Sequence, residues 1–126
     1  NMSLMFAYAY SFNNGDAAME WDTSSVTNMH YMFGIYGDNS GVFNQDISSW
    51  DVSKVTNMST MFQKQKSFNQ NLSNWKTLNV TDMSYMFYDA SVFDSQDLSS
   101  WDVSNVIDYS KFMDFAGENN TEPIWP

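Results

Sequence analysis

Apolar side chains recur along the chain in two short patterns separated by polar stretches. In the first, apolar residues follow Ile47 at plus three and plus five, namely Trp50 and Val52, with Asp51 between them. This alternation predicts a short strand that turns Trp and Val inward and Asp outward. In the second, apolar residues follow Val55 at plus three, plus six and plus seven, the spacing of one face of a short helix. Each unit is therefore predicted as a strand, a turn, a helical turn and a loop.

The two patterns repeat together in one register. The tryptophans give the period, because Trp21, Trp50, Trp75 and Trp101 are separated by 29, 25 and 26 residues, a spacing typical of repeat architectures. The apolar frame around each Trp opens with Ala18, Ile47, Leu72 or Leu98, and a further apolar anchor, Phe12, Phe43, Phe68 or Phe93, precedes it. "NMSLMF" at residues 1–6 aligns with "NMHYMF" at 28–33, so the chain opens with the tail of an earlier copy. It also ends within a copy, which suggests a piece of something longer.

No single copy can bury its apolar face alone, so the copies are expected to stack. We predict one α/β repeat solenoid over residues 1–126, a right-handed leucine-rich-repeat-like stack of ~25-residue coils with a parallel strand ladder and short helical turns. The predicted core consists of columns of equivalent residues: Trp21, Trp50, Trp75, Trp101; Val26, Val55, Val80, Val106; Met29, Met58, Met83; Phe33, Phe62, Phe87; and Phe43, Phe68, Phe93.

Charge and composition exclude several classes of partner. Fifteen acidic and five basic residues give a net charge of −10, which disfavours nucleic acid and anionic membranes. The absence of cysteine excludes disulfides, thiolate metal clusters and a thiol nucleophile. No apolar run reaches the ~18 residues that a membrane-spanning helix requires. No acid/base pair, nucleophile motif or phosphate-binding loop can be identified, so the sequence predicts a protein that is not an enzyme and has no cofactor.

The repeating unit also resembles a known family. V-T-N-M-S-x-M-F, a variable stretch and then F-N-Q-D-I-S-S-W-D-V-S resemble the BspA-like leucine-rich repeat of the Mycoplasma-lipoprotein-associated type, the DUF285 family, from Asn1 to about Phe115. The resemblance implies a secreted or surface-attached protein that adheres to host or matrix proteins, with no shared catalytic residues. This chain departs from the pattern at Lys76, at Tyr109 and in the longer loop at 34–42.

Two polar columns are predicted to face solvent on the strand side. They are Asp22, Asp51, Lys76, Asp102 and Asp46, Asn71, Asp97. Stacked carboxylates repel one another, and Lys76 is expected to relieve that repulsion. Oxygen-rich columns can bind calcium, with Asp46, Asp51, Asp97 and Asp102 as candidate ligands. However, no EF-hand loop or glycine-aspartate nonapeptide is present, and a solvated polar face is the favoured interpretation.

Tyrosines outside the core frame are expected to be exposed and are the best candidates for contact with a partner. They are Tyr8, Tyr10, Tyr31, Tyr36, Tyr85 and Tyr88, and tyrosine is enriched at protein interfaces. Tyr31, Tyr36, Tyr85 and Tyr88, together with Asp22, Asp51, Lys76 and Asp102, form the predicted binding surface. The single histidine, His30, is expected at the surface without a catalytic partner.

Two functional hypotheses follow. The leading one is a non-enzymatic protein-protein interaction or adhesion module at the cell surface or outside the cell. The alternative is a structural subunit or spacer that docks onto neighbouring subunits of a larger assembly.

Overall fold

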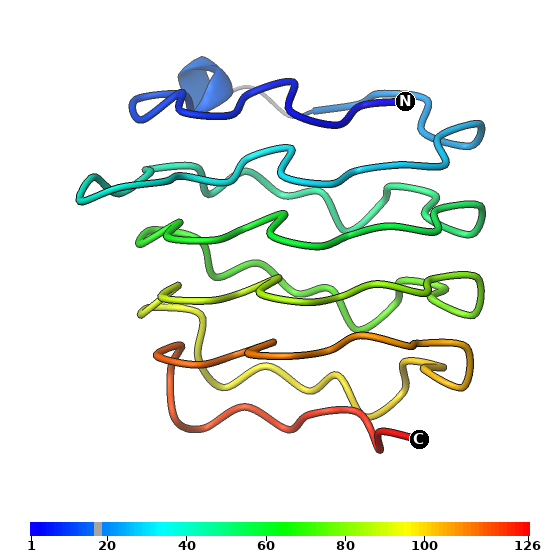
Figure 1. The fold of residues 1–126 in the computed structure, drawn as a ribbon. Helices are drawn as coiled ribbons and strands as arrows, with labels where there is room; N and C mark the ends of the chain where they lie inside the picture. Colours follow the sequence, from blue (N-terminus) through cyan, green and yellow to red (C-terminus); the bar gives the residue numbers. More distant parts are fainter. Residues whose placement is uncertain (17–18) are drawn as a thin grey trace.

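The computed structural model describes residues 1–16 and 19–126 as layers of irregular chain stacked from the amino to the carboxyl end (Figure 1). Within these residues the only helix is the short 3-10 helix η1 (Asn14–Asp16). Pairing between strands is limited to isolated parallel bridges: Asn28 with Asn57, Asn57 with Asp82, Asp82 with Asp108, Gly41 with Gln65, and Asp97 with Thr121. Ala18, which opens the first predicted frame, lies outside the described residues. No described helix has the length and apolar character needed to cross a membrane.

The predicted α/β solenoid with a parallel strand ladder is therefore wrong. Helix accounts for only 2% of the chain and strand for 7%, and the described residues form no sheet. The expected helix over 55–62 fails at Thr60, whose φ of 57° lies in the left-handed region, because right-handed helices do not continue through such a residue. Instead the Met61 amide donates to the Met58 carbonyl, which closes a β-turn.

The expected strand over 47–52 is also replaced by turns. The Trp50 amide donates to the Ile47 carbonyl at 3.1 Å. The Ser48 and Ser53 amides donate to the side-chain oxygens of Asp46 and Asp51, each at 2.9 Å. A carboxylate that binds the amide two residues further on forms an Asx turn, which competes with an extended strand. The inward and outward alternation survives, since Trp50 and Val52 are buried and Asp51 is exposed.

Backbone hydrogen bonds join the layers in an unusual arrangement. On one face, which we call the aligned face (residues 1–8, 28–35, 57–64, 82–89 and 108–114), every second amide of a layer donates to the next layer. The amides of Met58, Thr60, Phe62 and Lys64 donate to the carbonyls of Asp82, Ser84, Met86 and Tyr88 at 2.8 to 2.9 Å. The carbonyls of residues 57, 59, 61 and 63 accept from the preceding layer. These peptide groups therefore all point the same way along the stack.

The core consists of aromatic columns between the two sides of each layer. Phe12, Phe43, Phe68 and Phe93 stack at centroid distances of 5.9 to 6.0 Å, beside a second column of Phe6, Phe33, Phe62 and Phe87 at 5.5 to 5.8 Å. Every residue of the predicted core is buried except Trp21, which is partly buried against it. The repeated sequence therefore places equivalent side chains above one another.

A polar column runs beside the phenylalanines. The side-chain oxygen of Asn13 accepts from the Asn44 amide, and the same bond links Asn44 to Asn69, Asn69 to Asp94, and Asp94 to Asn119, at 2.8 to 3.1 Å. Each of these side chains supplies an acceptor for the backbone of the next layer. The residue after the phenylalanine anchor therefore has a structural role in every copy.

Candidate ligand-binding site

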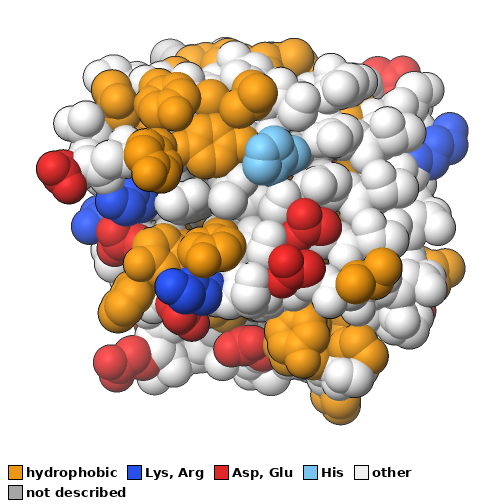
Figure 2. Space-filling view, viewed as in Figure 1, with side chains coloured by type: hydrophobic (Ala, Val, Ile, Leu, Met, Phe, Trp, Pro, Cys, Tyr) orange, Lys and Arg blue, Asp and Glu red, His pale blue; other side chains and the backbone are white. Residues whose placement is uncertain are grey.

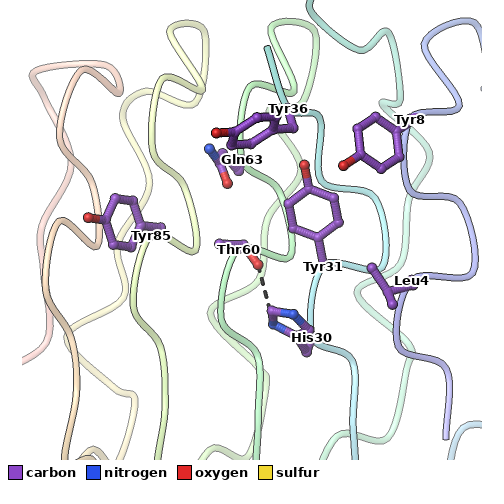
Figure 3. Close-up of a pocket in the computed structure, with 8 residues that line it drawn as sticks. All are labelled: Leu4, Tyr8, His30, Tyr31, Tyr36, Thr60, Gln63 and Tyr85. Atoms are coloured by element: carbon purple, nitrogen blue, oxygen red, sulfur yellow. Dashed lines mark hydrogen bonds between the residues drawn. The ribbon is translucent and has the colours of Figure 1, made fainter.

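A pocket of about 530 Å³ opens on the aligned face (Figure 3). Its lining comes from four successive layers and the loop after the second: Leu4, Tyr8, His30, Tyr31, Tyr36, Thr60, Gln63 and Tyr85. Figure 2 shows hydrophobic side chains gathered beside the chain's single histidine, His30. The lining contains four tyrosines, and no lysine, arginine, aspartate or glutamate is among its described residues.

Backbone conformation explains why four of these side chains meet. Leu4, Tyr31, Thr60 and Tyr85 occupy the same position of successive layers, and all are left-handed, with φ between 54° and 61°. A shared backbone conformation at equivalent positions presents the side chains in register at one edge of the stack. Leu4, Thr60 and Gln63 were not among the predicted contacts. The variable position in N-M-S-x-M-F is the sequence signal that could have identified the first two.

Tyr31 occupies the centre of the pocket and was wrongly expected to be exposed. It is only 8% exposed, and its hydroxyl has no hydrogen-bond partner among the described residues. The nearby Tyr8 hydroxyl points toward it in Figure 3, without reaching hydrogen-bond geometry. Burial raises the pKa of Tyr31 above its ordinary value, and Tyr8, Tyr10 and Tyr36 contribute to the shift. The Tyr31 hydroxyl is therefore neutral, and its interaction with Tyr8 falls short of full hydrogen-bond geometry; a buried hydroxyl left without a hydrogen bond costs about 1–3 kcal/mol.

Tyr36 stands at the rim, on the loop that distinguishes the second copy. It is 67% exposed. The loop turns at Gly37, whose φ is 79°, and the Lys64 ammonium donates to the Gly37 carbonyl. Gly34, before Tyr36, is packed closely, because a Cβ there would lie 2.8 Å from a carbon of the Tyr31 ring. This close approach keeps the loop against Tyr31 and leaves Tyr36 accessible to a ligand.

Polar groups form the lower edge of the pocket. His30 is half-buried rather than fully at the surface, and its Nδ1 lies 2.8 Å from the Ser59 hydroxyl. The Thr60 hydroxyl lies 3.4 Å from the same nitrogen. His30 is thus held by neutral hydroxyls, with no carboxylate among these contacts. This arrangement positions the imidazole but provides no acid or base partner of the kind that proton-transfer catalysis uses.

The two other predicted tyrosines form a pair further along the same face. Tyr85 and Tyr88 are both half-buried, with ring centroids 5.4 Å apart and planes inclined at 54°. The Lys111 ammonium lies 5.5 Å from the Tyr85 centroid and 5.9 Å from the Tyr88 centroid. These distances are within the range of cation–π attraction. The pair therefore already holds a cation from the same chain.

The predicted aspartate columns have a local role in the structure. Asp22, Asp46, Asp51, Asp97 and Asp102 are exposed, and each accepts the amide of the serine two residues on. These hydrogen bonds lower the pKa of each carboxyl. Lys76 is exposed. Among the described residues no three acidic or histidine side chains gather closely enough to hold a metal ion, so the calcium candidates are not brought together.

These features define a repeat protein in which stacked layers of turns surround aromatic columns and a tyrosine-lined pocket opens on one face. The family described as "Mycoplasma protein of unknown function, DUF285" matches residues 1–125, and the chain belongs to that family. No curated protein and no solved structure matches the chain.

Proposed function

We propose that this chain is a non-enzymatic module that binds another protein through the tyrosine pocket and its rim. The observation that carries the proposal is a pocket of about 530 Å³ lined by four tyrosines, with Tyr36 67% exposed at its rim. Tyrosine rings supply a large, partly apolar contact area with a polar tip, which suits burial against another protein. Tyrosines at the centre of a patch are frequent binding hot spots.

The proposal includes a BspA-like repeat in a protein that is located outside the cell or at its surface. The resemblance of the sequence to that repeat supports both points. The corresponding role is adhesion to a host or matrix protein. A rigid stack suits this role, because the backbone bonds between layers fix the pocket before the partner arrives, and preorganisation reduces the entropic cost of association.

A structural subunit is the second candidate, and exposed apolar side chains favour it. Ile107, Phe115 and Ile124 are 84%, 71% and 89% exposed. Side chains of this type at such exposure suit a contact with a neighbouring subunit. They come from the layer that includes residues 107–125, whereas the tyrosine pocket begins at Leu4, so variants can separate the two surfaces.

A capture experiment tests both candidates. The wild-type chain is immobilised beside Tyr36→Ala and Ile124→Ala and exposed to surface and matrix protein extracts. Loss of a discrete, saturable partner with Tyr36→Ala, but not with Ile124→Ala, is the expected result. The reverse pattern would transfer the function to the apolar surface and support the structural subunit. A partner retained by both variants would exclude both surfaces as its binding site.

A further inference from the structure

We infer that the pocket contains a slot that receives one aromatic side chain of the protein partner. The slot lies over Thr60, between Tyr31 and Tyr85. The inference deepens the proposed function and rests on it, because the ring must be presented by a protein.

Thr60 interrupts a column of large side chains on the aligned face. The Tyr31 amide donates to the Ser59 carbonyl, so Thr60 follows Tyr31 in the next layer. The Thr60 amide donates to the Ser84 carbonyl, so Tyr85 follows Thr60 in the layer after that. All three column residues are left-handed, with φ of 54°, 57° and 56°, so their side chains leave the backbone in the same direction. The small threonine therefore leaves a gap where the layers on either side carry a tyrosine ring.

The two flanking rings pack away from this gap. Tyr31 packs toward the preceding layer, with its centroid 5.9 Å from that of Tyr8. Tyr85 packs on Tyr88 of its own layer, at 5.4 Å. Figure 3 shows Tyr31 and Tyr85 on opposite sides of Thr60, and all three line the pocket. The space over Thr60 is therefore open to a side chain from outside the chain.

The walls of the slot select an aromatic occupant. Tyrosine rings attract a further ring in offset or edge-to-face packing beyond what the buried area alone provides. The core of this chain already stacks rings one layer apart, since Phe43, Phe68 and Phe93 follow one another at 5.9 Å. A ring over Thr60 would continue the tyrosine column in the same way.

The composition of the lining disfavours a charged occupant. No lysine, arginine, aspartate or glutamate is among the described lining residues, so a charged side chain would lose hydration without gaining a counter-charge. The rim suits the chain that carries the ring. Tyr36 is 67% exposed, and the half-buried Gln63 side chain offers an amide donor and acceptor for a partner backbone.

Ring resonances of the tyrosines provide the direct test. The whole chain, with ¹³C-labelled tyrosine, is titrated with N-acetyl-phenylalanine amide and, separately, with N-acetyl-cyclohexylalanine amide, which has a saturated and more apolar ring of similar size. We expect the phenylalanine probe to shift the Tyr36 and Tyr85 resonances with an affinity about fivefold higher, the difference that one aromatic pair provides. Equal or weaker binding of the phenylalanine probe would overturn the aromatic slot.

A gap-filling variant makes the test specific to the site. Thr60→Tyr supplies a ring from the chain itself, at a left-handed φ that Tyr31 and Tyr85 already adopt, and should abolish the response. Leu78→Tyr adds the same residue at a position that is 50% exposed and outside the pocket lining, and should leave the response intact. Thermal melts establish that both variants are folded. A full response in folded Thr60→Tyr would contradict the assignment.

A second variant separates the space over Thr60 from its hydroxyl. Thr60→Val keeps the size of the side chain and removes the hydroxyl, so the response to the phenylalanine probe should persist. Loss of the response in folded Thr60→Val would show that the hydroxyl binds the probe, and would overturn the slot.

The outcomes also distinguish this inference from the proposed function. A partner that requires Tyr36 but still binds Thr60→Tyr, and is not displaced by excess N-acetyl-phenylalanine amide, would leave the binding module intact and refute the slot. Selective binding of the phenylalanine probe, with no partner that depends on Tyr36, would support the slot and refute the protein-binding module.

Discussion

The indole Nε1 of Trp101 donates a hydrogen bond of 2.9 Å to the carbonyl oxygen of Leu72 in the preceding layer. Trp50 and Trp75 make the equivalent bonds to Met19 and Ile47, at 2.8 and 3.3 Å. Each tryptophan therefore fills the core and ties two layers together at the same time. Each of these carbonyls also accepts a backbone amide, from Trp21, Trp50 or Trp75, so removal of the indole takes away one of its two donors. The bond and the packing can therefore be tested separately.

Trp75→Phe should reduce the free energy of unfolding by about 1 kcal/mol, because it retains an aromatic ring but removes the indole donor and leaves the Ile47 carbonyl with the Trp50 amide alone. Trp75→Ala should cost at least about 3–5 kcal/mol through the cavity it leaves, enough to unfold a domain of ordinary stability. Urea denaturation followed by circular dichroism measures both. Wild-type stability in Trp75→Phe would show that the indole bond contributes nothing.

Tyr31→Phe should stabilise the free chain by about 1 kcal/mol, because it removes a buried hydroxyl that has no partner while preserving the ring. Tyr85→Phe, at a half-buried position in the same column, is the matched control and should change stability little. A loss of stability in Tyr31→Phe would mean that the hydroxyl is satisfied in solution.

Asn69→Ala should destabilise the fold by about 1 kcal/mol, because the Asn69 side-chain oxygen accepts both the Asp94 amide at 3.1 Å and the Gln96 side chain at 2.9 Å. Asn69→Asp should cost much less, since Asp94 itself serves as the acceptor for Asn119 in the next layer. Thermal unfolding of the two variants compares them directly. Equal losses would indicate that the side-chain volume, and not the acceptor, matters at this position.

Acid should destabilise the chain through its Asx turns. Hydrogen bonds from the Ser24, Ser99 and Ser104 hydroxyls and amides lower the pKa values of Asp22, Asp97 and Asp102 below the ordinary value. A carboxyl whose pKa is lower in the folded state stabilises the fold above its unfolded pKa of about 3.9, and that contribution disappears as the pH falls through the folded pKa. Denaturation midpoints should therefore decrease as the pH falls from about 5 toward 2.

Substitution of these three residues by asparagine provides the control for that prediction. Asn57 and Asn71 already accept the amides of Ser59 and Ser73, so asparagine preserves the turn and removes the titration. The triple variant should lose less stability than the wild type between pH 5 and 2. Identical pH profiles would assign the acid sensitivity to other carboxyls.

The repeated frame was enough to predict which side chains are buried, but not the local structure that buries them. Apolar residues at plus three, plus six and plus seven suit a helix, and they suit equally a series of β-turns that each advance by about the same number of residues. The deciding residue is Thr60, whose left-handed conformation no propensity scale would predict for a β-branched side chain. The Asx turns did have a signal, since Asp-x-Ser recurs at 22–24, 46–48, 51–53, 97–99, 102–104 and 108–110.

The pocket was harder to predict for a different reason. The pocket forms where side chains from four layers meet. The sequence predicts that these side chains occupy equivalent positions of the repeat, but not the backbone conformation that turns them to one edge of the stack. Tyr31 lies in the variable position, so it was expected to be exposed, whereas Tyr8, Tyr36 and Gly34 enclose it. The contact of the Lys111 ammonium with the rings of Tyr85 and Tyr88 likewise depends on the spacing between layers, which the sequence does not give.

The shared direction of the peptide groups on the aligned face makes that face electrically polar along its length. Each such group contributes a dipole of about 3.5 D, and dipoles aligned head to tail sum as they do in a helix. Because the amides point toward the later layers, the positive pole lies near residues 108–114 and the negative pole near residues 1–8. Leu4 and Tyr8 line the tyrosine pocket from the first layer, so the pocket extends toward the negative pole, where the backbone itself favours a positively charged group of a partner.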